Sequence, residues 1–362
     1  MKRLLGIGCS VLLLLIQMPT AAAVGTSASS AILMDAQSGH ILYEQNAYEP
    51  RLIASITKLM TALVALESGH SLEESVTILP EWAGAEGSSI YLRAGEKLSL
   101  ETLLYGMLLR SGNDAALSVA GYCGGTIEAF VSAMNEKAHQ LGMEHSSFAN
   151  PNGLNAEDHY STAYDMALLA RACLENEVLT KIVQTKSITL DNRTFTNHNK
   201  LLWQYDGCIG MKTGYTEKAG RTLVSAASRE GMTLICVTLN DPDDWKDHAA
   251  LLDYGFAKYR SHQALGSEDI ICRLPVSGSL LPFCPVVPKE DYFIAVQDSD
   301  RVDVSLEWDN VLNAPLRHGD TVGWAVVCLN GEEVTRIDLV AAKTIPCNLA
   351  PERKVQNWFK SS

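Results

Sequence analysis

Two side chains near residue 55 have the types and the spacing needed to attack a carbonyl group. Ser55 and Lys58 are separated by Ile56 and Thr57, and this spacing puts two side chains on one face of a helix. A serine hydroxyl is a weak nucleophile until a base removes its proton. A lysine amine serves as that base only when burial or a nearby positive charge lowers its pKa. The pair therefore indicates Ser55 as a nucleophile and Lys58 as its general base.

The surroundings of Lys58 favour this interpretation over a purely structural one. Lys58 lies between Ile56, Leu59 and Met60, in the apolar part of the predicted helix. Ser55 at the start of that helix has free backbone N–H groups nearby, which suit an oxyanion. The alternative is that Ser55 only caps the helix and that Lys58 is a solvated charge.

A second group, Ser111-Gly112-Asn113, lies in a predicted loop between two helices. Ser111 carries a hydroxyl that can pass a proton between Lys58 and a leaving nitrogen. Asn113 carries an amide that can hold both Lys58 and a substrate carbonyl. The alternative is an ordinary turn in which Asn113 opens the next helix.

A third group, Lys212-Thr213-Gly214, precedes a strand predicted at residues 222–227. A substrate peptide is expected to lie along such a strand as an added β-strand. Lys212 and Thr213 would bind a terminal carboxylate, and Gly214 would let the substrate backbone approach closely. Lys212 would also supply the positive charge that lowers the pKa of Lys58. The alternative is a plain β-turn.

Hydrophobic periodicity predicts the elements that must position these groups. Strands are predicted at residues 31–34, 40–44, 222–227 and 233–239, and helices at 56–66, 100–109, 114–120, 127–140 and 162–172, with one more through 251–252. Beyond residue 262 the pattern becomes all-β: apolar and polar residues alternate over 302–309, and Asn330-Gly331 indicates a hairpin. We expect one unit over 24–262, a sandwich-like β unit over 263–348 and a tail over 349–362.

The N-terminus has the pattern of a secretory signal peptide over residues 1–23. Lys2 and Arg3 precede a short apolar run at 11–16, and the small residues 21–23 follow. An uncleaved anchor helix is the alternative. The tail contains Trp358 and Lys360, so weak peripheral contact with a membrane surface and a frayed terminus both remain open.

Composition excludes some functions. The formal net charge is −13, whereas nucleic-acid binding requires a basic surface. The cysteines are widely spaced with no Cys-x-x-Cys pair, so no zinc site is indicated. We expect no nucleic-acid partner and no metal.

The three motifs, in this order, resemble those of the low-molecular-mass penicillin-binding proteins, the D-alanyl-D-alanine carboxypeptidases of the S11 peptidase type. The resemblance covers nearly the whole chain after residue 27. Further stretches that carry it are 148–154, 159–162, 199–202, 210–216 and 251–256.

This resemblance implies a mixed α/β (α+β) fold of the DD-peptidase and β-lactamase type, an antiparallel sheet flanked by helices, followed by a C-terminal all-β domain. It implies an exported enzyme that removes the terminal D-alanine from peptidoglycan stem peptides, needs no cofactor, and is acylated by β-lactam antibiotics. The implied nucleophile is Ser55 and the base is Lys58, with Ser111 and Asn113 completing the proton path. Lys212, Thr213 and Gly214 would bind the substrate, and the backbone N–H groups of Ser55 and Tyr215 would form the oxyanion hole.

One feature departs from the family pattern. Many members carry an arginine after the strands that follow the third motif, but residues 241–246 contain none. Lys246 is a candidate substitute for binding the substrate carboxylate.

Two other functions compete with the carboxypeptidase prediction. A class A-like β-lactamase would need a second base, and Glu157, Asp158 and the glutamates at 175 and 177 lack the expected sequence around them. A non-catalytic wall-binding or regulatory protein of the same fold would keep its function without Ser55.

Overall fold

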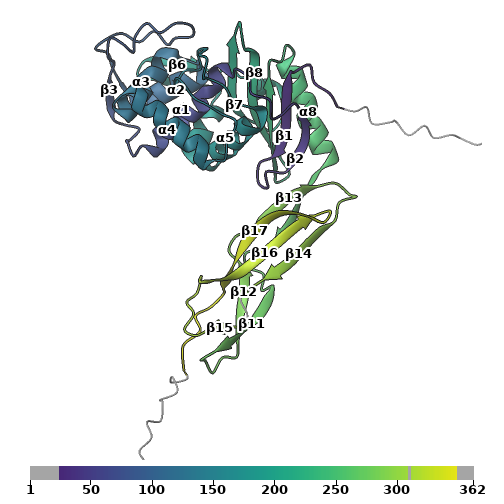
Figure 1. Ribbon diagram of the computed structural model, residues 1–362. Helices are drawn as coiled ribbons and strands as arrows, with labels where there is room; N and C mark the ends of the chain where they lie inside the picture. Colours follow the sequence, from purple (N-terminus) through teal and green to yellow (C-terminus); the bar gives the residue numbers. More distant parts are fainter. Residues whose placement is uncertain (1–23, 309–310, 349–362) are drawn as a thin grey trace, which may run out of the picture.

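The computed structural model describes residues 24–308 and 311–348 and consists of two lobes. The first contains the helices of the described residues, a five-stranded antiparallel sheet and two small hairpins, and the second is an elongated all-β lobe (Figure 1). The signal peptide predicted at 1–23 and the tail predicted at 349–362 lie outside the described residues. No helix of the described part is long and apolar enough to cross a membrane.

The sheet of the first lobe has five antiparallel strands in the order β2-β1-β9-β8-β7. Its strands are β1 (Ser30–Asp35), β2 (Ile41–Gln45), β7 (Cys208–Thr216), β8 (Gly220–Arg229) and β9 (Met232–Leu239). Every residue of β1 is buried, as expected for a central strand covered on both faces. β7 is an edge strand, so one side of it is available to another chain.

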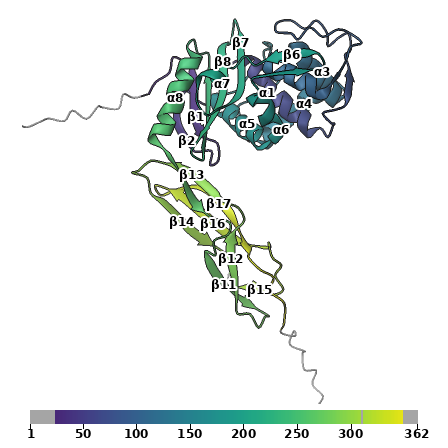
Figure 2. The ribbon, with the colours of Figure 1, turned by 180° about the vertical axis from the view of Figure 1, so that it is seen from behind.

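Helices cover both faces of this sheet, as the front and back views show (Figure 2). The helices of this lobe are η1 (Ala54–Thr57), α1 (Lys58–Glu67), α2 (Leu100–Leu109), α3 (Asn113–Gly124), α4 (Ile127–Gln140), α5 (Ala163–Glu175), α6 (Glu177–Gln184), α7 (Leu201–Gln204) and α8 (Asp244–Lys258). α5 packs on β1 and β9 from one side, and α8 packs on β8 and β9. The side chains of Ser99, Thr126 and Thr162 cap α2, α4 and α5 by accepting a backbone N–H, which fixes where these helices begin.

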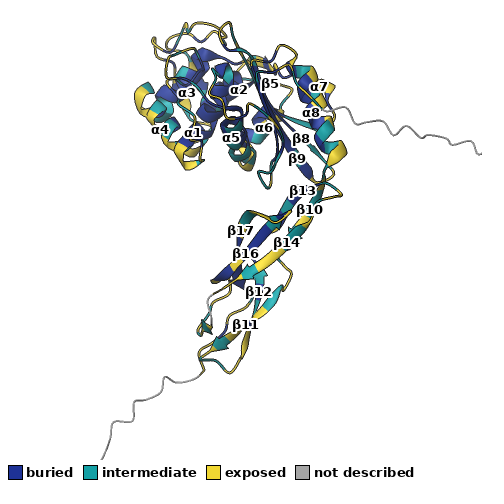
Figure 3. Cartoon of the chain, turned by 45° about the vertical axis from the view of Figure 1, so that its right-hand side comes forward, coloured by how far each residue is buried: buried dark blue, intermediate teal, exposed yellow. Residues whose placement is uncertain are grey.

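Two small hairpins complete the first lobe. They are β3 (Ser75–Thr77) with β4 (Lys97–Ser99), and β5 (Ser187–Leu190) with β6 (Arg193–Thr196). The core lies between the sheet and the helix group, where α1 and α2 are almost entirely buried (Figure 3).

The second lobe has its own hydrophobic core. Its strands are β10 (Arg260–Leu265), β11 (Cys272–Ser277), β12 (Phe283–Pro288), β13 (Tyr292–Val296), β14 (Val302–Glu307), β15 (Leu312–Asn313), β16 (Thr321–Leu329) and β17 (Glu332–Ala341). Six of them form one sheet, and β10 pairs with β13 in another. The hairpin predicted at Asn330-Gly331 joins β16 to β17, with both residues at positive φ.

The mixed α/β fold with an all-β C-terminal lobe confirms the predicted fold class. The predicted boundary near residue 263 stays a prediction, and β10 spans it. The expectation that substrate adds to the 222–227 strand is wrong. β8 is paired on both sides, by β7 and β9, and therefore has no free edge.

Candidate active site

The nucleophile candidate Ser55 lies in the 3₁₀ turn η1, directly before α1. Ala54 has a positive φ of 49°, so the backbone bends sharply in front of the serine. Gly153 is packed against this bend. A Cβ at Gly153 would overlap the carbonyl oxygen of Ala54 and lie 3.0 Å from the Ser55 nitrogen, and Gly153 itself has a φ of +85°. The position therefore requires glycine.

Lys58 is completely buried and its amine is directed at Ser55. Its Nζ lies 2.8 Å from the Ser55 Oγ, within hydrogen-bond distance, and donates to the Asn113 Oδ1 over 2.7 Å. A third bond goes to the backbone carbonyl of Asn152. Burial, followed by the charge of Lys212, holds the pKa of Lys58 well below its usual value, although Asp114 opposes this. Both effects favour the neutral amine that a general base requires.

Lys212 and Ser111 form the second half of the cluster. Lys212 is 1% exposed, and its Nζ donates to the Ser111 Oγ over 3.1 Å and to the Thr213 carbonyl over 2.8 Å. Burial lowers the pKa of Lys212 to about 7. Ser111 has a φ of +60°, an uncommon conformation for a residue with a side chain and one that gathers at functional sites.

The start of α3 is held by a loop that closes over it. The Asn113 Nδ2 donates to the Glu86 carbonyl over 2.6 Å. The buried carboxylate of Asp114 accepts from the backbone N–H groups of Ile90 and Leu92 at 3.0 and 2.9 Å. Asn113 is therefore fixed from two sides, and its Oδ1 remains directed at Lys58.

Strand β7 brings the third motif against the nucleophile. A Cβ at Gly214 would lie 2.9 Å from the Ser55 nitrogen, so the absent side chain allows β7 to approach η1. Thr213 is half-buried and Tyr215 is 64% exposed at the open edge of the sheet. The third motif is thus part of a strand, and the plain-turn alternative is wrong.

The structure thus brings Ser55, Lys58, Ser111, Asn113 and Lys212 into one hydrogen-bonded cluster. Thr213, Gly214 and Tyr215 follow Lys212 along the adjacent strand edge.

Sequence reasoning missed Arg221, which lies on β8 opposite Tyr215. Its Nη2 donates to both carboxylate oxygens of Asp244 at 2.8 Å, and its guanidinium lies 5.6 Å from the ring centre of Trp245. The Arg221 Nε is buried without a hydrogen-bond partner among the described residues. Lys246, the substitute proposed from sequence, is exposed on α8. No local pattern in the sequence marks Arg221, because its position depends on strand pairing.

The site pairs a serine with a buried lysine, beside the edge strand of an antiparallel sheet that is flanked by helices. This arrangement is typical of the serine acyl-transfer enzymes in which lysine takes the place of histidine. Residues 17–243 match the family model described as D-alanyl-D-alanine carboxypeptidase, peptidase S11. Residues 281–346 match the C-terminal domain of penicillin-binding protein 5. The chain therefore belongs to the S11 family of D-alanyl-D-alanine carboxypeptidases.

Individual relatives agree over most of the chain. The D-alanyl-D-alanine carboxypeptidase DacF of Bacillus subtilis is 32% identical over 87% of this chain and 85% of its own. The Escherichia coli carboxypeptidase DacA is 31% identical over 88% of this chain and 84% of its own. The crystal structure of penicillin binding protein 5 from Haemophilus influenzae has a TM-score of 0.78 at 30% identity, covering 89% of this chain and 98% of that one.

These matches confirm the predicted family and the predicted class of activity, a carboxypeptidase of peptidoglycan metabolism that belongs to the penicillin-binding proteins. The β-lactamase and non-catalytic alternatives gain no support from them.

Proposed function

We propose that Ser55 attacks the carbonyl carbon of the peptide bond between the last two D-alanines of a peptidoglycan stem peptide. The observation that carries this is the 2.8 Å bond from the buried Lys58 Nζ to the Ser55 Oγ. Neutral Lys58 takes the hydroxyl proton as the new C–O bond forms. The resulting oxyanion would be stabilised by the backbone N–H groups of Ser55 and Tyr215.

The leaving D-alanine needs a proton on its nitrogen when the C–N bond breaks. Ser111 accepts a hydrogen bond from Lys212 at 3.1 Å, and Asn113 holds Lys58 on the other side. We assign Ser111 to carry the proton from Lys58 to the leaving nitrogen. Water then attacks the Ser55 ester with Lys58 again as base, which releases the shortened stem peptide and regenerates the enzyme.

Substrate binding is assigned to the edge of β7. The peptide would add to this strand through backbone hydrogen bonds, beside Gly214. Its terminal carboxylate would meet the ammonium of Lys212 and the hydroxyl of Thr213. A β-lactam, whose ring amide and carboxylate mimic the same group, would acylate Ser55 in the same place.

We place the enzyme outside the cytoplasm, in the cell envelope, because the predicted signal peptide indicates export and the proposed substrate, peptidoglycan, lies there. We also propose that the chain divides into two units at residue 263 and that the β lobe serves as a stalk for the catalytic unit. The 349–362 tail would make weak contact with a membrane surface. Deleting residues 263–362 would leave cellular wall activity and location unchanged if the stalk proposal were wrong.

The purified mature chain is expected to release D-alanine from a pentapeptide stem continuously and to hydrolyse nitrocefin only as a stoichiometric burst. Rapid nitrocefin turnover without D-alanine release would instead establish a β-lactamase. In that case the missing second base would have to be found, and Glu175 is a poor candidate because it lines a crevice between the two lobes.

The pH dependence is expected to show the charge state of Lys212. Burial lowers the pKa of Lys212 to about 7, so the ammonium is present below that pH and is lost above it. We expect kcat/KM for the pentapeptide to fall as pH rises through about 7, because kcat/KM reports groups of the free enzyme. A substrate whose terminal carboxylate is amidated should lack this alkaline limb. If the limb persists with the amide, it does not come from binding of the carboxylate by Lys212.

Arg221 is proposed as a second group that recognises the carboxylate, in place of the arginine missing from 241–246. Asp244 and Trp245 hold it beside the third motif. Arg221→Gln should lower kcat/KM for the free-acid substrate roughly 10- to 100-fold, the range of one charged hydrogen bond, and change little for the amidated one. Arg229→Gln, on the same strand, is the control. Equal losses for both substrates would show that Arg221 is only structural.

A further inference from the structure

We propose that the crevice between the two lobes binds a lysine- or arginine-bearing peptide segment of a partner molecule. This site is separate from the cluster around Ser55, because none of the three motifs lines the crevice. The proposal therefore goes beyond the carboxypeptidase activity and does not depend on it.

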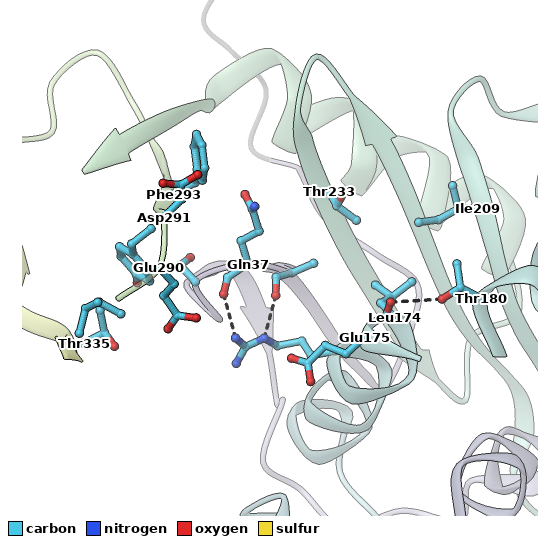
Figure 4. Close-up of a pocket in the computed structure, with 15 residues that line it drawn as sticks. Gln37, Leu174, Glu175, Thr180, Ile209, Thr233, Glu290, Asp291, Phe293 and Thr335 are labelled. Carbon is cyan, nitrogen blue, oxygen red and sulfur yellow. Dashed lines mark hydrogen bonds between the residues drawn. The ribbon is translucent and has the colours of Figure 1, made fainter. Parts of the chain in front are cut away.

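The crevice is a cavity of about 650 Å³ whose walls come from both lobes. The first lobe contributes Gln37 in the turn after β1, and Arg171 and Glu175 on α5. The second lobe contributes residues 290–293 and the β17 residues Thr335 and Ile337. Figure 4 shows Glu290, Asp291 and Phe293 on one side of Gln37, and Glu175 and Thr233 on the other. A cavity of this size is typical of ligand sites.

The charges that line the crevice favour a cationic ligand. Glu175, Glu290 and Asp291 contribute three carboxylates, and the structure shows no ion pair to any of them within the described residues. Arg171, the one cation of the lining, is held by the first lobe: its Nε and Nη2 donate to the carbonyls of Ala36 and Gln37 at 2.9 Å. The crevice therefore has an excess of negative charge that its own side chains do not neutralise.

A buried hydroxyl in the same wall is the second observation. Tyr292 lines the crevice and is 8% exposed, and its hydroxyl oxygen is buried without a hydrogen-bond partner among the described residues. Buried hydroxyls in folded proteins are nearly always bonded, so an unpaired one needs an explanation. The Tyr292 oxygen is enclosed in the wall, so a ligand ammonium or guanidinium would have to push the neighbouring side chains apart before its N–H could donate to this oxygen, while the carboxylates neutralise its charge.

The surface around Tyr292 fits a peptide better than a free cation. β13 is paired with β10 on one side only, and its Tyr292 and Phe293 both line the crevice. An unpaired strand side offers backbone groups, and Phe293 offers an apolar contact, for an extended segment beside the charged side chain. A segment held by Glu175 and Glu290 together would contact both lobes and fix their relative position.

The test uses the mature chain and a fluorescent tetralysine peptide, followed by anisotropy at physiological ionic strength. Wild type should bind one peptide saturably, and Glu175→Gln/Glu290→Gln should bind at least about tenfold more weakly. Tyr292→Phe should weaken binding measurably because it removes the acceptor, while labelling of Ser55 by penicillin stays normal in every variant. Glu73→Gln/Glu128→Gln removes the same charge from exposed positions elsewhere and should bind like wild type.

Two results would overturn the proposal. Absence of saturable binding would show that the crevice is not a cation site. Equal weakening in the Glu73→Gln/Glu128→Gln control would show that the peptide only follows the net negative charge of the protein.

Discussion

Lys58→Met is expected to lower the rate of Ser55 acylation by about a thousandfold or more, within the range for loss of a general base and its positioning. Methionine fills a similar apolar volume but has no amine to take the Ser55 proton, and the 2.8 Å contact with the Ser55 Oγ is lost. The measurement is the time course of labelling by a fluorescent penicillin.

Lys58→Arg separates the basicity of the amine from its charge. Arginine keeps a cation in the site but is not deprotonated in proteins, so it should be as inactive as methionine. Both variants leave the Asn113 Oδ1 without its lysine donor, so folding must be confirmed by circular dichroism. Acylation by folded Lys58→Arg at the wild-type rate would exclude Lys58 as the base.

Gly153→Ala is expected to have the second largest effect, on stability and activity together. The new Cβ would overlap the Ala54 carbonyl and press on the Ser55 nitrogen, at a φ of +85°. Left-handed backbone alone costs roughly 1–2 kcal/mol, and the overlap with backbone adds to it, so we expect a loss of about 3 kcal/mol or more in unfolding free energy. Displacement of Ser55 should slow acylation in whatever fraction stays folded.

Gly69→Ala is the matched control for this substitution. Gly69 has the same φ of +85°, but a Cβ there meets no atom within 4 Å. The Gly69→Ala variant should lose only the unfolding free energy that the left-handed backbone costs, and its Ser55 should be acylated at the normal rate. Equal stability losses in the two variants, measured by urea unfolding, would show that contact with the Ala54 carbonyl is unimportant.

Local sequence patterns predicted the elements whose periodicity is strong. The ranges 100–109 and 127–140 agree with α2 and α4, because apolar spacing and the capping residues Ser99 and Thr126 both act locally. The prediction of a helix over residues 56–66 is less accurate. Its first turn is the 3₁₀ turn η1, and the distant Gly153 packs against the bend at Ala54 in this turn, a contact that no local pattern predicts.

Hydrophobic periodicity alone does not predict the active site. The three motifs are separated by dozens of residues. Residue chemistry suggests roles that join Lys58, Ser111 and Lys212, and the order of the motifs in the family resemblance supports that they meet. The third motif was placed before a strand, although it lies within β7, because Gly210 and Gly214 weaken the strand signal. No local pattern indicates Arg221, because its position beside the third motif comes from pairing with β7 and from Asp244 on α8.

The most direct test of the central proposal compares wild type with Ser55→Ala. Ser55 is half-buried, and its replacement by alanine removes only the hydroxyl, so the variant should fold normally. A fluorescent penicillin should label wild type alone, and only wild type should release D-alanine from a pentapeptide stem. Labelling of folded Ser55→Ala, or D-alanine release by it at a comparable rate, would show that the acyl-enzyme does not form on Ser55.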